Sequence, residues 1–291
     1  MRGVLFRIFR IFRRHARPRE REPNRNYGMM VLTKCAGGLM EPLLVARGLT
    51  KCFGSFVAVD AIDLTVNRGE VLVLLGPNGA GKTTTIGMLT GLLRPSSGTV
   101  HIAGLDIRHD ARAVKRLIGY LPDEPNLYDK LTARESIYLM ARLYGTTDNV
   151  AQRASDLMQY FGLLEMADSL VGSCSHGTKQ KIALCGLLIH NPTVLLLDEP
   201  MLGLDPHSVR LFKETIRALA DQGKALIVCS HLLSIAQTIC DRLAILRHGR
   251  VLFQGSLDEL RVSAHASESE SLEDIFLRLT EEPPSTLPNQ P

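Results

Sequence analysis

The chain has 291 residues, of which 45% are apolar and 22% are charged, enough for one large domain with tails or for two small domains. Its longest uninterrupted apolar runs reach four or five residues, whereas a membrane-spanning helix needs about 20, so we do not expect this chain to cross a bilayer by itself. The six cysteines show no CxxC spacing and are too few for a disulfide scaffold, which favours a reducing cytoplasm.

The net charge of +4 is unevenly distributed along the chain. Residues 1–25 hold nine Arg and two Glu, whereas the rest of the chain holds 25 basic and 28 acidic residues. Within residues 1–39, apolar side chains recur on one helical face with arginines opposite, a pattern typical of a membrane-surface helix or a targeting peptide. We favour a third interpretation, a disordered extension upstream of a later start at Met29, Met30 or Met40.

The first ordered part of the chain combines short β-like runs with a glycine-rich loop and one helix. This helix begins near Lys82, directly after the loop, and is expected to end near Leu92. The β-like runs cover residues 43–45, 56–59, 62–66, 71–75 and 99–102.

A helix-rich region of about 70 residues follows. Thr132 and Glu135 form a capping box before IYLMARLY, and an apolar stripe from Val150 to Phe161 predicts another helix.

After residue 190 the pattern returns to strand, helix and strand: TVLLLD, Pro206–Ala220 with Asp205 as its N-cap, and ALIVCSH. Continuous apolar strands that alternate with helices predict an α/β fold with a parallel sheet covered on both faces.

The most specific stretch is VLVLLGPNGAGKTTT, which satisfies G-x-x-x-x-G-K-[ST] between a predicted strand and a predicted helix. Its glycines let backbone N–H groups turn inward around an anion, and the helix adds its positive N-terminal end. Lys82 is expected to contact the β- and γ-phosphates and Thr83 to supply an oxygen to Mg²⁺. The predicted ATP site consists of Gly76, Pro77, Asn78, Gly79, Ala80, Gly81, Lys82, Thr83 and Thr84.

TVLLLDEP supplies the second half of this site. Asp198 stands at the carboxyl end of a buried strand, where open α/β sheets bind their ligands, and is the predicted Mg²⁺ partner. Glu199 is a candidate to orient or deprotonate the attacking water. The alternative is an ordinary acidic pair at the end of a strand.

With these motifs, the chain from about Met40 to residue 280 resembles an ABC transporter ATP-binding subunit of the bacterial type encoded separately from its permease. GPNGAGKT, CSHGTKQ, LLLDEP, GLDP and SH follow one another in the order of that family. The resemblance implies a P-loop NTPase core with a parallel sheet, an antiparallel β subdomain and a helical subdomain. We divide the chain into a basic amphipathic or disordered extension (1–39), the ATP-binding domain (40–255), a C-terminal helical extension (256–280) and a tail whose composition predicts disorder (281–291).

By this resemblance, CSHGTKQ is the family signature, and Ser175 and Gly177 bind the γ-phosphate of ATP held by a second protomer. A hydroxyl, an unobstructed backbone N–H and a helix N-terminus are all suited to an anion. The sequence departs from the family at His176 and Thr178, where Gly and Gln are usual. The alternative role of Ser175 is that of a plain helix N-cap.

Three further positions match the family. Phe53 aligns with the aromatic residue that stacks on adenine, or else it is an ordinary core Phe. His231 aligns with the histidine that contacts the γ-phosphate and is assigned to catalysis together with Glu199 and Lys82. Asp205 corresponds to the residue that couples the two ATP sites, unless it serves mainly as an N-cap.

Asp123 is a departure from the family, which usually has Gln after Gly-Tyr-X-Pro, on the segment that faces the permease. A carboxylate at this position can still bind Mg²⁺, but it is shorter and adds negative charge, so slower turnover or altered coupling is expected. The neighbouring Glu124 is compatible with a simple surface acid.

The resemblance implies an ATP hydrolase at the cytoplasmic face of the inner (plasma) membrane. Its expected partners are a transmembrane permease, through which it would be held peripherally at the membrane, and a second ATP-binding subunit, identical or paired; no nucleic acid partner is expected. Export is favoured over import. The alternatives are a nucleotide-binding regulator with low turnover, suggested by Asp123 and His176, and an ABC ATPase that acts on ribosomes or DNA.

Overall fold

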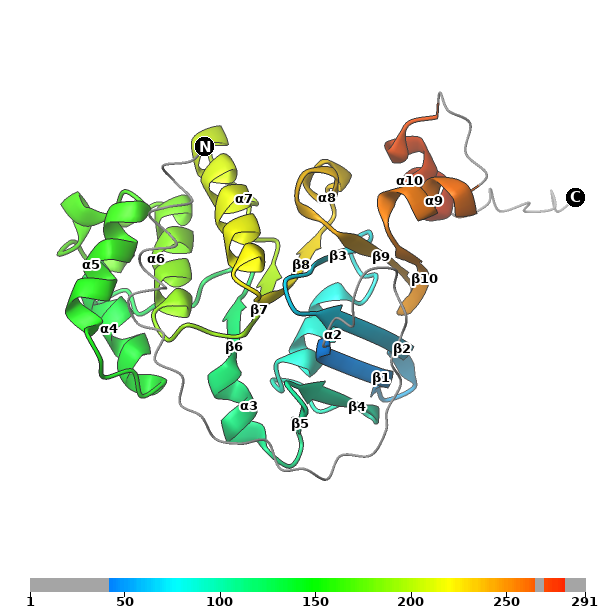
Figure 1. Ribbon diagram of the computed structural model, residues 1–291, viewed down its shortest axis with the longest axis horizontal. Coiled ribbons are helices and arrows are strands. Elements are labelled where there is room, and N and C mark those ends of the chain that lie inside the picture. The colour runs from blue at the N-terminus through cyan, green and yellow to red at the C-terminus, as the bar shows by residue number, and fades with distance from the viewer. Residues whose placement is uncertain (1–41, 265–269, 281–291) are drawn as a thin grey trace, which may run out of the picture.

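The computed structural model describes residues 42–264 and 270–280, so the predictions for 1–39 and 281–291 lie outside the described residues. The described chain forms a small antiparallel sheet, a larger mostly parallel sheet, and a group of helices set to one side (Figure 1). This is the three-part architecture expected from the sequence.

The antiparallel sheet has the strand order β2-β1-β4-β5. The short β-like runs at 43–45, 56–59 and 62–66 are parts of two long strands, which pair along their length with several register shifts. The prediction of separate short strands was therefore wrong, because β-bulges allow the pairing of β1 and β2 to continue where the apolar pattern is interrupted. The four strands are β1 (Pro42–Phe53), β2 (Phe56–Asn67), β4 (Ser97–Ile102) and β5 (Leu105–Asp106).

The larger sheet has the order β10-β9-β3-β8-β7-β6, with parallel pairing from β9 to β6 and an antiparallel edge strand β10. Strand β6 lies inside the segment predicted to be rich in helices and was not anticipated, since only four residues, one of them glycine, pair with β7. The six strands are β3 (Val71–Leu75), β6 (Ile118–Leu121), β7 (Val194–Asp198), β8 (Ala225–Ser230), β9 (Arg242–Arg247) and β10 (Arg250–Gly255).

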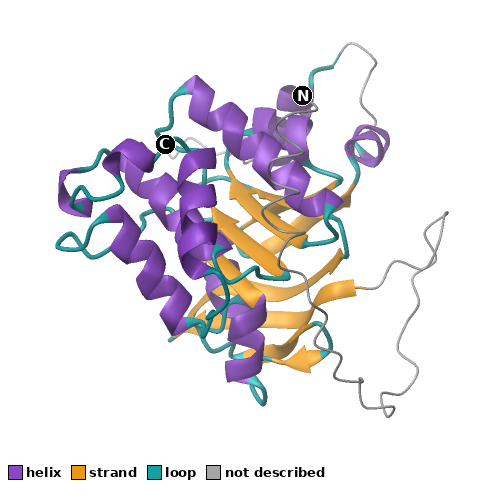
Figure 2. Cartoon of the chain, turned by 60° about the vertical axis from the view of Figure 1, so that its left-hand side comes forward, coloured by secondary structure: helices purple, strands orange, loops and turns teal. Residues whose placement is uncertain are grey.

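Alternate residues of the parallel strands face two separate hydrophobic cores, because successive strand side chains point to opposite faces of a sheet. Val71 and Val73 belong to the core formed with the large helices, whereas Leu72 and Leu74 belong to the core shared with the antiparallel sheet. Helix α2 (Lys82–Leu89) contributes to this second core. The prediction that both faces of the parallel sheet are covered is confirmed (Figure 2).

Helix α2 ends three residues earlier than the sequence predicts. The Thr90 hydroxyl donates to the carbonyls of Ile86 and Gly87, both at 3.0 Å, and Gly91 then takes a φ of 71°. A residue in this left-handed region ends a helix, so the apolar residues after it belong to a turn.

The helical part lies to the left in Figure 1. The predicted capping box is confirmed: Glu135 N donates to the Thr132 hydroxyl at 3.2 Å, and Thr132 N donates to the Glu135 carboxylate at 2.8 Å. The chain from β5 to β7 forms α3 (Ala111–Leu117), α4 (Ala133–Leu143), α5 (Val150–Tyr160), two 3₁₀ turns η1 (Leu164–Met166) and η2 (Val171–Ser173), and α6 (His176–Leu188).

The remaining helices pack on the large sheet from the side of the first core. Helix α7 begins as predicted, with Asp205 as its N-cap and Pro206 in its first turn. The apolar residues Leu272 and Ile275 fix the last helix in the same core. These elements are α7 (Pro206–Asp221), α8 (Leu233–Ile239), α9 (Leu257–Ser263) and α10 (Leu272–Thr280).

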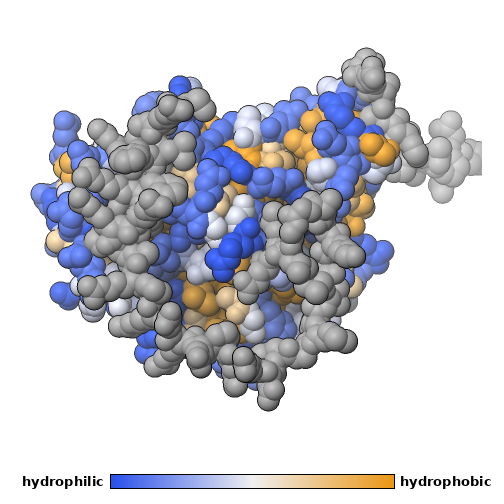
Figure 3. Space-filling model, in the orientation of Figure 1, coloured by the Kyte–Doolittle hydropathy of each residue, from blue (hydrophilic) through white to orange (hydrophobic). Residues whose placement is uncertain are grey.

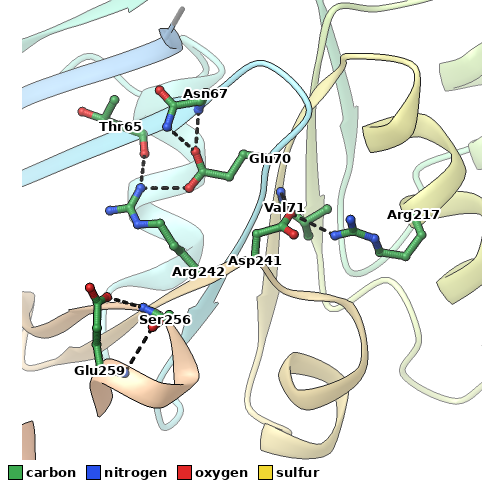
Figure 4. A network of polar contacts seen from close by, with 9 residues as sticks. All are labelled: Thr65, Asn67, Glu70, Val71, Arg217, Asp241, Arg242, Ser256 and Glu259. Carbon is green, nitrogen blue, oxygen red and sulfur yellow. Dashed lines mark hydrogen bonds and ion pairs between the residues drawn. The ribbon is translucent and has the colours of Figure 1, made fainter. Parts of the chain in front are cut away.

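A polar network joins the two sheets and α7 (Figure 4). Glu70 is 6% exposed; it accepts hydrogen bonds from Asn67 N and Nδ2, both at 2.7 Å, and pairs with Arg242 at 2.8 Å. Asp241 accepts from Val71 N at 2.8 Å and from Arg217 of α7 at 2.9 Å. Because buried charges are costly unless they are paired, these contacts define how β2, β3, β9 and α7 sit relative to one another.

None of the helices in residues 42–264 and 270–280 is both long enough and apolar enough to pass through a bilayer. Most of the described surface seen in Figure 3 is hydrophilic, and apolar side chains are exposed beside α9 and α10, including Val262 and Leu277.

Candidate functional site

The loop between β3 and α2 packs tightly against the backbone of β2 and β9. A Cβ atom at Gly76 would lie 2.4 Å from the Leu246 carbonyl oxygen, and one at Gly81 would lie 2.8 Å from the Ala58 carbonyl oxygen. Gly81 has a φ of 103° and is the N-cap of α2. Glycine is therefore required at both ends of this loop for steric reasons, as well as for bringing backbone N–H groups toward an anion.

Lys82 is the first residue of α2 and is only 7% exposed. Its Nζ donates to the carbonyl oxygens of Gly76 at 2.6 Å and Pro77 at 3.1 Å, so the ammonium group lies inside the curve of the loop. A cation held there by neutral carbonyls keeps its full charge available to phosphate oxygens. Thr83 is exposed, and its side chain lies near enough to the carboxylate of Asp198 to lower the pKa of Asp198.

Asp198 ends β7, is 2% exposed, and its Oδ1 has no hydrogen-bond partner among the described residues. Burial raises the pKa of Asp198; the hydrogen bond from Thr83 and the charge of Lys82 oppose the shift, and the charges of Glu199 and Asp123 add to it. A buried carboxylate with a free oxygen beside a threonine hydroxyl is a donor set that suits Mg²⁺.

The described residues contain no group of three or more His, Cys, Asp or Glu side chains that could hold a metal ion. Mg²⁺ is usually held by one or two protein carboxylates together with substrate phosphates, so a protein cage is not required. Thr83 and Asp198 therefore fit the ion as a partial set that nucleotide phosphates would complete.

Glu199 and His231 form a pair beyond the ends of β7 and β8. His231 Nδ1 lies 2.9 Å from Glu199 Oε1, and the Glu199 side chain is 13% exposed. Glu199 has a φ of 44°, unusual for a residue with a side chain, while its N–H donates to the Cys229 carbonyl at 3.1 Å. A strained backbone held by a hydrogen bond on each side is typical of a functional residue whose carboxylate must point in one direction.

Asp123 lies two residues after β6, beside the edge where β7 ends in Asp198. Its charge raises the pKa values of Asp198 and Tyr120, and the pairing of β6 with β7 places the three residues at the same end of these strands. Burial, followed by the charges of Asp198, Cys229 and Asp123, raises the pKa of Tyr120 to about 12. Tyr120 was not singled out from the sequence, because a tyrosine in GYLP carries no signal until β6 is known to pair with β7.

The N-terminus of α6 is built from Ser175, His176 and Gly177. Ser175 is the N-cap: its hydroxyl accepts from Thr178 N at 3.3 Å and lies 3.0 Å from the Thr178 hydroxyl. A Cβ at Gly177 would lie 3.2 Å from the Leu204 side chain, so this glycine also permits close packing on the turn after Glu199. The N-cap alternative for Ser175 is thus correct as a description of this chain, and a phosphate contact remains a prediction.

Phe53 lies at the end of β1 and is 50% exposed, which rules out the alternative of a core phenylalanine. Lys51 Nζ lies 5.0 Å from the centre of its ring. Asp205 caps α7 by accepting from Ser208 N at 3.0 Å, and hydrogen bonds from Ser208 lower the pKa of Asp205 to about 2. Its capping role is confirmed, and coupling to a second site remains a prediction.

The predicted residues thus fall into groups. The loop Gly76–Thr84, Asp198, Glu199, His231 and Asp123 gather where the parallel strands end, which is where such sheets bind ligands. No hydrogen bond within the described chain joins Ser175, Gly177 or Phe53 to this loop. The chain therefore gathers the first group of predicted residues at one edge of the sheet, and its described hydrogen bonds do not link Ser175, Gly177 or Phe53 to the loop Gly76–Thr84.

The family model described as ABC transporter matches residues 59–202. The chain is 36% identical to the ABC transporter ATP-binding protein NatA of Bacillus subtilis (strain 168), over 86% of this chain and 97% of that protein. It is 37% identical to the Nod factor export ATP-binding protein I of Burkholderia lata, over 72% of this chain and 69% of that protein. A solved structure of an ATP-binding subunit of an ABC transporter superposes with a TM-score of 0.78 at 31% identity, covering 82% of this chain and all of the other.

Proposed function

The chain belongs to the ABC transporter family as an ATP-binding, ATP-hydrolysing subunit, and from this premise we propose that it dimerises around two ATP molecules to power a separate membrane permease. The observation that carries the proposal is that the described hydrogen bonds of Ser175 stay within α6 and do not reach the loop Gly76–Thr84. Ser175 is exposed at the N-terminus of α6, where an anion would be favoured, while the chain's own loop, Lys82 and Asp198 form a phosphate site without it.

The proposed chemistry is hydrolysis by positioning and electrostatics. The loop amides and Lys82 would hold the β- and γ-phosphates, and Ser175 and Gly177 of a second copy would close the site from the other side. Glu199, oriented by His231 and by its own strained backbone, would orient the attacking water or take a proton from it. Phe53, exposed at the end of β1, would stack on adenine.

Thr83 and Asp198, with Asp123 close by, are the proposed residues for Mg²⁺. When bound, the ion would neutralise charge on the phosphates. These residues by themselves keep a hydroxyl close to a buried carboxylate, since Thr83 acts on the pKa of Asp198 and Asp198 Oδ1 has no partner among the described residues.

The proposed partner is a transmembrane permease that holds this subunit at the cytoplasmic face of the inner (plasma) membrane. Relatives named for Nod factor export and for linearmycin resistance favour an export system. The segment that follows β6 and carries Asp123 is the proposed contact with the permease.

The test is the mass in solution of the Glu199→Gln variant, measured by light scattering with and without ATP. This isosteric change would keep ATP bound by removing the carboxylate that activates water. A monomer that becomes a dimer with ATP is the expected result. A variant that binds ATP and stays monomeric, both alone and with its permease, would contradict the two-sided site.

A second candidate, a nucleotide-binding regulator with low turnover, is favoured by one observation. Asp123 adds a negative charge beside the buried Asp198, where the family has a neutral Gln. Turnover with and without Asp123→Gln, each with the permease, separates the two: ordinary turnover of the natural protein would dismiss the regulator.

A further inference from the structure

A surface ion pair connects the segment after β6 with the helix that begins at Ser175. Lys179 Nζ, in the first turns of α6, lies 3.1 Å from Asp129 Oδ1. Asp129 belongs to the segment 122–131, which follows β6 and begins with Pro122 and Asp123. The pair is therefore a direct contact between the proposed permease-facing segment and the signature helix.

Backbone contacts run beneath this ion pair. Gly172 N donates to the Asp129 carbonyl at 3.0 Å, and Val171 N donates to the Leu131 carbonyl at 2.8 Å. Thr132 and Leu170 form an antiparallel bridge next to them. A Cβ at Gly172 would lie 3.2 Å from the Cβ and the carbonyl oxygen of Asp129, so the two chain segments touch with no space between them.

The same contacts hold α6 at two points on either side of its N-cap. Upstream, the 3₁₀ turn η2 (Val171–Ser173) leads to Ser175 and is closed by the bond from Cys174 N to the Val171 carbonyl at 3.0 Å. Downstream, Lys179 is four residues after Ser175, so its side chain lies on the same face of the helix one turn along. Lys179 N also donates to the Ser175 carbonyl at 2.9 Å.

We propose that Asp129 and Lys179 are positioning residues, which hold the Ser175 end of α6 ready for the partner's ATP and transmit displacements of segment 122–131 to it. The inference rests on the proposed function, because it concerns the second face of the same site. A helix end that is already oriented loses less freedom when it meets its ligand, so the ion pair strengthens ATP-dependent dimerisation. It leaves the binding of ATP to the chain's own loop unchanged, since no hydrogen bond or ion pair of the described residues joins Asp129 or Lys179 to that loop.

A second surface ion pair, between Arg134 and Asp168, serves as a matched control. Arg134 Nε lies 2.9 Å from Asp168 Oδ1, and the exposed fractions of the two side chains, 34% and 79%, are close to the 28% and 69% of Lys179 and Asp129. This second pair joins the start of α4 to the turn after η1, and the described hydrogen bonds of its two side chains do not reach α6. Breaking it removes a comparable surface interaction without releasing the signature helix.

The experiment compares Asp129→Asn, Lys179→Gln, both changes together and Asp168→Asn, each introduced into the Glu199→Gln variant. The dimer dissociation constant at saturating ATP is measured by sedimentation. The affinity of the monomer for a fluorescent ATP analogue and the melting temperature are measured alongside it. An exposed ion pair changes an equilibrium by roughly two- to fivefold, and a dimer contains two of them, so the dissociation constant should rise about four- to 25-fold.

The expected pattern has three parts. Asp129→Asn and Lys179→Gln weaken the dimer equally, the double variant is no weaker than either, and Asp168→Asn leaves the dimer unchanged at a similar melting temperature. Equal dimerisation of the Asp129→Asn and Asp168→Asn variants, or additive effects of the two changes, would overturn the inference. If the Glu199→Gln parent itself stays monomeric at saturating ATP, both alone and with its permease, the proposed function fails, and this inference fails with it.

Discussion

Replacing His231 by Ala removes the hydrogen bond that orients the proposed base. His231 Nδ1 lies 2.9 Å from Glu199 Oε1, and the backbone of Glu199 is strained at a φ of 44°. A hydrogen bond to a charged group contributes about 1.5–3 kcal/mol, and each 1.36 kcal/mol is tenfold in rate. If the whole of this interaction is needed to hold the carboxylate toward water, the kcat for ATP hydrolysis should fall by roughly 10- to 150-fold.

The KM for ATP should change little, because the proposed phosphate ligands are the loop and Lys82, whose ammonium group is held by the Gly76 and Pro77 carbonyls and not by His231. The assay is steady-state ATPase activity with the permease, together with ATP affinity measured directly. His231→Gln is the conservative variant, whose amide can still donate to Glu199 and should restore part of kcat. The reasoning would be refuted by an unchanged kcat, or by a loss confined to ATP affinity.

Three further predictions concern stability and the phosphate loop. Gly81→Ala should lower the melting temperature and abolish ATP binding, because the added Cβ would lie 2.8 Å from the Ala58 carbonyl oxygen. Gly79→Ala is the milder control in both assays, because Gly79 has a φ of 80° but an added Cβ would meet no atom within 4 Å. Asp198→Asn should raise the melting temperature without nucleotide, since burial raises the pKa of Asp198 and its charge therefore destabilises the folded state at pH 7, while hydrolysis is lost; a lower melting temperature would contradict this. Burial lowers the pKa of Lys224 from 10.5 to about 8, so the unfolded state binds more protons between these values. The free energy of unfolding of the natural protein, relative to Lys224→Met, should therefore rise by roughly 3 kcal/mol between about pH 8 and pH 10.5 in denaturant titrations, and a flat difference would exclude this burial effect.

The parts of the fold that depend on residues adjacent in the sequence could be predicted from the sequence. The phosphate loop, the caps at Thr132, Ser175 and Asp205, and the buried strands are set by backbone geometry and by apolar runs a few residues long. Elements of weak local pattern were missed or misjudged: β6 is a strand only because it pairs with β7, and the first two strands are continuous only through their bulges.

The candidate site divides in the same way. The sequence by itself determined which residues are proposed to carry the chemistry, because Lys82, Asp198 and Glu199 stand in short motifs whose spacing is typical of a phosphate ligand, a metal ligand and a base. Only the tertiary structure decided that Glu199 meets His231, that Asp123 and Tyr120 lie beside Asp198, and that Asp129 reaches Lys179. These contacts join residues that lie 32 to 78 positions apart in the sequence, so no local pattern encodes them. The order of the strands in the sheet and the packing of α6 against the segment after β6 bring these residues together.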